Sequence, residues 1–179
     1  ADEAVDQISV TAGQVRFNLG GFTHEVLDPS DVGVRVGFLS TETASLLVRG
    51  GELLTPGATL GFLSGAEGTL DVAGSTALLT VTSRMVVGQG GTGTLKISSG
   101  GVVDFGPDLD VGTDVNSTGL IDLDGIDSLL FGAAAITLGQ GGSSRSATLD
   151  MFGTPTVTAG SPDVRLSGLV TGSGSLDAD

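Results

Sequence analysis

Several residue types are missing from this chain of 179 residues, and each absence excludes a class of site or structure. There is no cysteine, which removes disulfides, thiolate metal sites and cysteine nucleophiles. There is no tryptophan or tyrosine and only 7 phenylalanines, so the core has to be aliphatic. The longest uncharged apolar stretch, residues 128–139, is far short of the roughly 20 residues that span a bilayer. The sequence therefore predicts no membrane insertion.

Positive charge is also scarce, because 7 basic residues face 21 acidic ones and leave a formal net charge of −14. Such a surface repels phosphate backbones, which excludes nucleic acid as a partner. The single histidine, His24, lies in an irregular segment without the Gly-x-Ser-x-Gly turn of a serine hydrolase. We therefore expect a protein that is not an enzyme. A carbohydrate-active enzyme with paired carboxylates is the weakest alternative, because aromatic sugar platforms are lacking.

Glycine is abundant, with 31 residues, whereas proline contributes only 5 and no period of three occurs. This excludes collagen and indicates many tight turns. Glycine in a helix interior costs about 1 kcal/mol relative to alanine, so helices have little support. The composition predicts an all-β chain.

Short apolar couplets, most of them closed by glycine, recur at intervals of 24 to 28 residues. A period in this range is typical of stacked structural repeats. Alternation of apolar residues points both onto one face of a strand, and the closing glycine allows a corner. The seven couplets begin at Val10, Val34, Ala58, Met85, Leu109, Ile136 and Val164 and end at Ala12, Val36, Leu60, Val87, Val111, Leu138 and Leu166.

Two further strands follow each couplet. Three short strands in about 25 residues fit one turn of a parallel β-helix better than a propeller blade of about 40. We expect Phe38 to stack on Phe62 and Phe105 on Phe131, one coil apart. The second strands are predicted at 46–48, 70–72, 95–97, 121–123, 149–151 and 176–178, and the third at 53–54, 79–81, 103–105, 129–131 and Val157.

Residues 87–103, which read VGQGGTGTLKISSGGVV, make the pattern specific enough to name a resemblance. This segment resembles the repeats of autotransporter passengers and of secreted bacterial proteins with PEP-CTERM sorting signals. Less regular copies cover residues 34–178. The resemblance implies a right-handed parallel β-helix of about seven coils, displayed outside the cell, commonly as an adhesin or stalk.

The ends of the predicted solenoid differ from its middle. Residues 1–33 are expected to form an irregular cap or first coil, with an inserted loop at 20–31, and 34–179 the β-helix domain. The segment 5–10 is a candidate strand for donation to a neighbour. At the other end the repeat stops within a coil and no polar cap follows. Either the chain is a fragment of a longer solenoid, or its open end meets another copy.

Self-assembly would use apolar residues from both ends. The predicted interface consists of Val5, Ile8, Val10, Val164, Leu166, Leu169 and Leu176.

Acidic residues gather in one coil and its junctions. Carboxylate oxygens suit Ca²⁺, although the spacing matches neither an EF-hand loop nor the Gly-Gly-x-Gly-x-Asp repeat. A separate outward row is expected along the second strands at Leu47, Asp71, Lys96, Asp122, Asp150 and Asp177, and a solvated acidic face explains it better than a binding stripe. The candidate calcium ligands are Asp108, Asp110, Asp122, Asp124 and Asp127.

The sequence thus predicts a non-enzymatic extracellular or cell-surface protein, the subunit of a filament or matrix fibre built by head-to-tail self-association. The alternatives are an adhesin stalk with a cell-surface or polysaccharide ligand, and a calcium-dependent binding module.

Overall fold

A computed structural model describes most of the chain, including nearly all of residues 3–132. Beyond residue 132 it describes mainly strand segments. Side chains are described for residues 4–28, 30, 32–125, 127–132, 136 and 137, and backbone also for 3, 135, 138, 146–152, 156–159, 165–166, 169–172 and 175–178.

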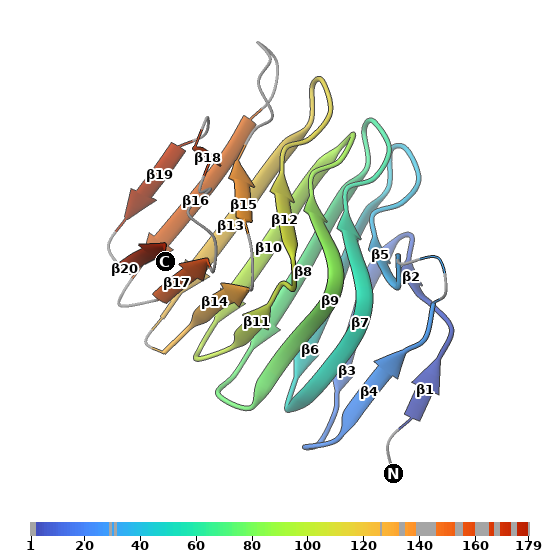
Figure 1. The fold of residues 1–179 in the computed structure, drawn as a ribbon. Helices are drawn as coiled ribbons and strands as arrows, with labels where there is room; N and C mark the ends of the chain where they lie inside the picture. The colour runs from blue at the N-terminus through green and yellow to red at the C-terminus, as the bar shows by residue number, and fades with distance from the viewer. Residues whose placement is uncertain are drawn as a thin grey trace.

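The described chain is an all-β parallel solenoid, and none of its elements is a helix. Strands lie side by side along its axis from blue β1 to red β20 (Figure 1). No described helix is long and apolar enough to cross a membrane. The strands are β1 (Glu3–Val5), β2 (Ile8–Val10), β3 (Gly13–Asn18), β4 (Thr23–Val26), β5 (Val34–Val36), β6 (Thr43–Arg49), β7 (Gly51–Leu60), β8 (Glu67–Ala73), β9 (Ala77–Val87), β10 (Thr92–Ser98), β11 (Val102–Asp104), β12 (Asp108–Val111), β13 (Thr118–Asp124), β14 (Leu129–Gly132), β15 (Ala135–Leu138), β16 (Ser146–Phe152), β17 (Thr156–Ala159), β18 (Arg165–Leu166), β19 (Leu169–Gly172) and β20 (Ser175–Ala178).

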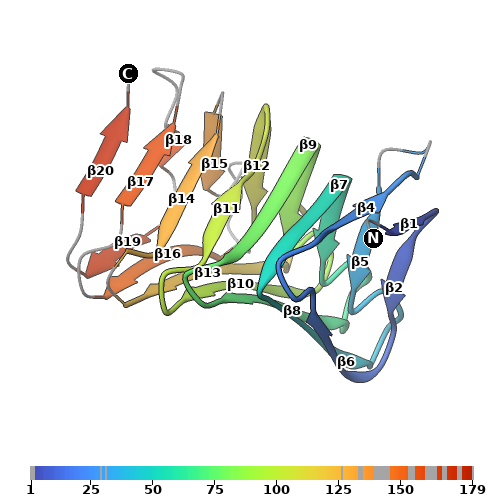
Figure 2. The same ribbon diagram turned by 90° about the horizontal axis from the view of Figure 1, so that it is seen from below.

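Two parallel sheets enclose the core. One has seven strands in the order β19-β16-β13-β10-β8-β6-β3. The other has 13 strands, because the third strand of one coil and the first strand of the next belong to the same bent sheet. Figure 2 shows the seven-stranded sheet as a layer beneath the strands of the larger one.

The bend lies within single strands in the middle of the solenoid. β7 and β9 each run through the third position of one coil and the first position of the next, with a register shift between Thr55 and Gly57 of β7. The predicted pattern of three separate short strands is therefore too simple for these coils. About five turns are formed, fewer than the seven expected. β15 to β20 continue the pairing beyond them, but the segments that connect these strands lie outside the described residues.

The couplets form the predicted inner ladders in the central coils. Val34 pairs in register with Ala58, which pairs with Met85, and Met85 with Leu109. All four are at most 1% exposed. Complete burial of a valine, methionine or leucine side chain stabilises the fold by about 1.5–3 kcal/mol, so each added coil extends the core.

The first couplet was placed two residues too late. Ile8 lies opposite Val34 and Val10 opposite Val36, so the inward pair of the first coil is Ile8 and Val10. Ala12 is exposed, and Gly13 already begins β3. The segment Val10-Thr-Ala-Gly mimics a couplet because it too ends on a small residue.

The third strand was predicted correctly in three coils and its facing wrongly in a fourth. Leu53, Leu79 and Val103 form a fully buried ladder. Opposite Val103, however, stands Leu130, which is buried, whereas Leu129 and Phe131 are only partly buried. Because residues 129–131 are all apolar, apolar and polar residues do not alternate there, and the sequence does not show which side chains point into the core.

One of the two predicted phenylalanine ladders exists. Phe38 and Phe62 stack with centroids 4.9 Å apart and planes inclined by 15°. The second ladder is wrong, because Phe131 pairs with Asp104, while the completely buried Phe105 packs where Gly132 leaves room.

The last predicted second strand was also misassigned. Residues 175–178 form β20, which pairs with β17, so Leu176 and Asp177 belong to the third position of their coil. The second position is taken by β19, in which Thr171 lies opposite Asp150.

The described part of residues 1–33 corresponds to the first coil, one of the two alternatives that the sequence left open. β2, β3 and β4 are the three strands of the first coil, and β4 falls within the segment expected to be a loop. β1 pairs with β4.

The corner glycines test how tightly the coils are stacked. Gly88 has φ +76°, and a methyl group there would lie 2.9 Å from the Gly119 nitrogen of the next coil and closer still to the Thr118 carbonyl. Gly13 has nearly the same φ, +79°, with no atom within 4 Å of such a methyl. Both glycines therefore have a positive φ, but only at Gly88 would an added methyl group meet backbone atoms of the next coil.

We predict that Gly88→Ala destabilises the protein more than Gly13→Ala. Both variants incur the left-handed penalty of about 1–2 kcal/mol. Gly88→Ala adds an overpacking cost of about 1–3 kcal/mol. Urea unfolding of the two variants and the parent measures the difference, and equal midpoints for the two variants would show that the coils are not in close contact at this corner.

Candidate functional site

Four of the five predicted calcium ligands are divided between two sheets, and the fifth lies in a turn. Asp108 and Asp110 lie on β12, whereas Asp122 and Asp124 lie on β13 of the seven-stranded sheet. Asp127 is exposed in the turn before β14, with φ +64°. Among the described residues no group of three or more acidic, histidine or cysteine side chains is placed to hold a metal. Calcium binding therefore stays a prediction from composition.

Asp110 has a partner of its own. Its Oδ2 accepts hydrogen bonds from Arg84 Nε at 2.8 Å and from the guanidinium Nη2 at 2.6 Å. Asp110 is 7% exposed, so the charge is largely removed from water. A buried carboxylate needs such a partner, which gives this residue a structural role between β9 and β12.

The outward row along the second strands begins one coil earlier than predicted. Arg16 on β3 lies opposite Leu47, which lies opposite Asp71, and then Lys96 and Asp122 follow. The Lys96 ammonium is 3.9 Å from Asp122, and both side chains are about one third exposed. The alternation of Val15 and Phe17 marked β3 as a strand, and this signal was missed in the sequence.

The predicted assembly residues occupy the two ends of the solenoid. Ile8 and Val10 are 8% and 4% exposed and belong to the core, and Val5 packs against it. At the other end, Leu166, Leu169 and Leu176 lie on β18, β19 and β20, where only the strands are described. Val164 lies outside the described residues.

The N-terminal end leaves strand edges and apolar side chains open. No described strand pairs with the outer side of β3, and β2 pairs with β5 alone. Val15 lies opposite the completely buried Leu46, yet is 36% exposed because no described coil lies beyond β3. Phe22, in the turn before β4, is 55% exposed.

His24 belongs to this end rather than to an irregular loop. It occupies the position on β4 that pairs with the buried Leu53, and its ring packs against Phe17 with centroids 5.8 Å apart. An aromatic contact at a core-facing position gives His24 a packing role there.

Asp28 holds the first coil to the second. Its carboxylate accepts hydrogen bonds from the Ser30 nitrogen at 2.8 Å, from Gln7 Nε2 at 2.9 Å and from the Gly33 nitrogen at 3.2 Å, and also from the Ser30 hydroxyl. The Ser30 hydrogen bonds above all lower the pKa of Asp28 below its usual 3.8, because they favour the ionised form.

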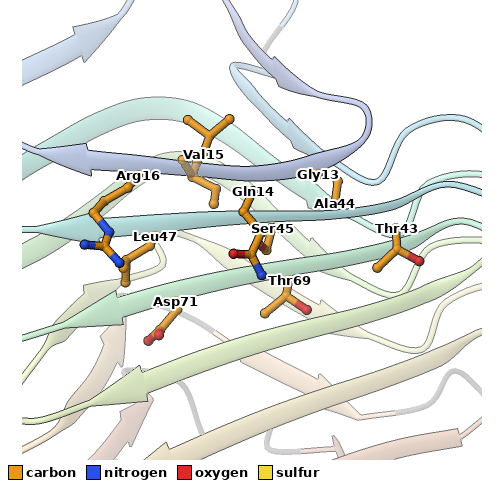
Figure 3. A pocket seen from close by; sticks show the side chains of 11 residues that line it. Gly13, Gln14, Val15, Arg16, Thr43, Ala44, Ser45, Leu47, Thr69 and Asp71 are labelled. Atoms are coloured by element: carbon orange, nitrogen blue, oxygen red, sulfur yellow. The ribbon is translucent and has the colours of Figure 1, made fainter.

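A hollow lies on the outer face of the seven-stranded sheet, beside its edge strand β3. It has a volume of about 750 Å³ and spans β3, β6 and β8. Figure 3 shows Gln14, Arg16, Ser45, Thr69 and Asp71 around it. Sequence reasoning did not find this hollow, because it depends on the first coil being part of the solenoid.

Comparison with known proteins gives no relative: no protein-family model matches the chain, and neither a curated protein nor a solved structure matches it significantly. Functional inference therefore rests on the geometry of the described residues.

We predict that Asp28→Asn destabilises the protein at neutral pH and less so in acid. A lowered folded-state pKa contributes stability above the unfolded value of 3.8, and this contribution is lost as pH falls through the folded value. Thermal unfolding of parent and variant at pH 7 and at about pH 2 measures the change.

Asp6→Asn is the matched control, because Asp6 is exposed and carries the same charge. The difference in melting temperature between the parent and Asp28→Asn should be smaller in acid than at pH 7. Asp6→Asn should melt like the parent at both pH values. A difference of equal size at both pH values would contradict the role of the ionised carboxylate.

Proposed function

We propose that this protein is a non-enzymatic structural subunit of an extracellular filament or matrix fibre, built by head-to-tail stacking of β-solenoids. The observation that carries the proposal is that no described strand pairs with the outer edges of β2 and β3, beside which Val15 is 36% exposed. Edge strands with free backbone groups are templates for pairing with another chain.

The direction of the strands favours stacking over lateral pairing. All described strand pairs are parallel. The three stretches of sheet that end at β18, β19 and β20 begin at β2, at β3 and at the pair of β1 and β4. A second copy in the same orientation would therefore continue each stretch with parallel strands. Such a heterologous contact repeats without closing and yields a filament.

β1 makes the N-terminal end stepped. It pairs with β4 and so extends one stretch of sheet beyond β2 and β3. If a second copy stacks directly on the first coil, its β20 pairs with β4 at the position that β1 occupies. β1 then has to move away from β4. β1 is only three residues long, which keeps the lost pairing small.

An adhesin passenger is the second candidate, favoured by the polar hollow on the outer face. Membership of the group of autotransporter passengers and PEP-CTERM proteins is likewise a proposal. It is supported by the repeat at residues 87–103 and by the parallel solenoid.

We predict that Val15→Lys prevents assembly. A lysine on the open face of the first coil would have to be buried without a partner against the incoming copy. Light scattering and electron microscopy of concentrated protein measure assembly: the parent should form filaments one solenoid wide, and Val15→Lys should remain monomeric.

Asn18→Lys is the matched control, because it adds the same charge to β3 at an exposed position. Asn18 directly follows Phe17, which pairs with the buried Val48, so by the alternation of the strand it faces outward and not toward the core. This variant should assemble like the parent, and so should a chain without residues 1–5. A monodisperse parent at high concentration, with or without calcium, or a Val15→Lys variant that still forms filaments, would contradict the proposal.

A further inference from the structure

The hollow on the outer face of the seven-stranded sheet has a floor made of two rows of side chains. In the first row Gln14, Ser45 and Thr69 follow one another in register from coil to coil. Two residues further along the strands, the second row consists of Arg16, Leu47 and Asp71. Successive members of a row are about 4.8 Å apart, the spacing of neighbouring strands.

The polar groups of the first row are not used within the described part of the chain. The side chains of Gln14, Ser45 and Thr69 make no hydrogen bond there. Arg16 is exposed and has no acidic partner among the described residues, whereas Asp71 accepts one hydrogen bond, from the Ser98 hydroxyl at 3.3 Å. The hollow therefore offers an amide, two hydroxyls, a guanidinium and a carboxylate oxygen to a ligand.

The arrangement of these groups limits the class of ligand. Hydroxyl and amide groups repeated at a constant spacing match a ligand that is itself a chain of similar hydroxyl-bearing units. Leu47 adds an apolar surface between Arg16 and Asp71, suited to the C–H face of a sugar ring. One positive and one negative charge line the hollow, and the chain carries −14 overall, which disfavours a polyanion.

We propose that this hollow is a binding site for a neutral oligosaccharide that runs along the solenoid axis. Arg16 and Asp71 hydrogen-bond to sugar hydroxyls at the two ends of the second row, while Gln14, Ser45 and Thr69 of the first row contact successive units. The hollow borders β3, whose edge and Val15 belong to the proposed stacking interface, but its polar side chains all come from one copy, so binding does not require assembly.

Calorimetric titration tests this proposal with neutral hexasaccharides of glucose, mannose, galactose and N-acetylglucosamine, and with a hexauronate as the charged probe. At least one neutral hexasaccharide should bind at millimolar concentration, and more tightly than the hexauronate. Arg16→Ala and Ser45→Leu should each weaken that binding at least tenfold, because one removes the guanidinium and the other replaces a hydroxyl with bulk on the floor.

Arg49→Ala is the matched control: it removes the same charge from β6, on the same sheet but outside the hollow, and should bind like the parent. Melting temperatures establish that each variant is folded. The proposal is overturned by a parent that binds none of the neutral sugars, by tighter binding of the hexauronate, or by folded Arg16→Ala and Ser45→Leu variants that bind as the parent does. Filament formation is measured independently by light scattering and electron microscopy. A parent protein that binds no sugar would therefore overturn the proposed binding site without contradicting the proposed structural role.

Discussion

Parallel, in-register pairing of one coil on the next is the constraint on which the rest of the structure depends. It aligns Leu46 with Leu70 and Leu95 inside, and by the same register it aligns the outward residues between them. A shift by one residue would turn the core toward solvent, so the inner ladders fix the outer rows as well. The hollow, the paired charges and the open end all follow from this register.

Much of the fold was predictable because the central couplets alternate clearly and end on glycine. Prediction failed where the local pattern was ambiguous. Ala12 and Gly13 imitated the close of a couplet, and Leu129, Leu130 and Phe131 gave no alternation from which to read a face. The long bent strands β7 and β9 were not visible either, because the bend depends on a register shift between coils rather than on local sequence.

The candidate site was harder to predict than the fold. The acidic residues that looked like a cluster in sequence are separated because β12 and β13 lie in different sheets, and Asp110 is taken by Arg84. Conversely, Arg16 and Asp71 are far apart in sequence and come together only through coil stacking. Proximity along the chain is therefore a poor guide in a solenoid, where neighbours in space are about one period apart.

Amide hydrogen exchange of β3, in dilute and in concentrated protein, tests the central claim most directly. In dilute protein β3 should exchange much faster than the central strand β10, because β3 is paired on one side only. On concentration β3 should become protected while β10 stays unchanged, since a second copy then pairs with the open edge. Filaments in which β3 still exchanges as fast as in dilute protein would contradict stacking through this end.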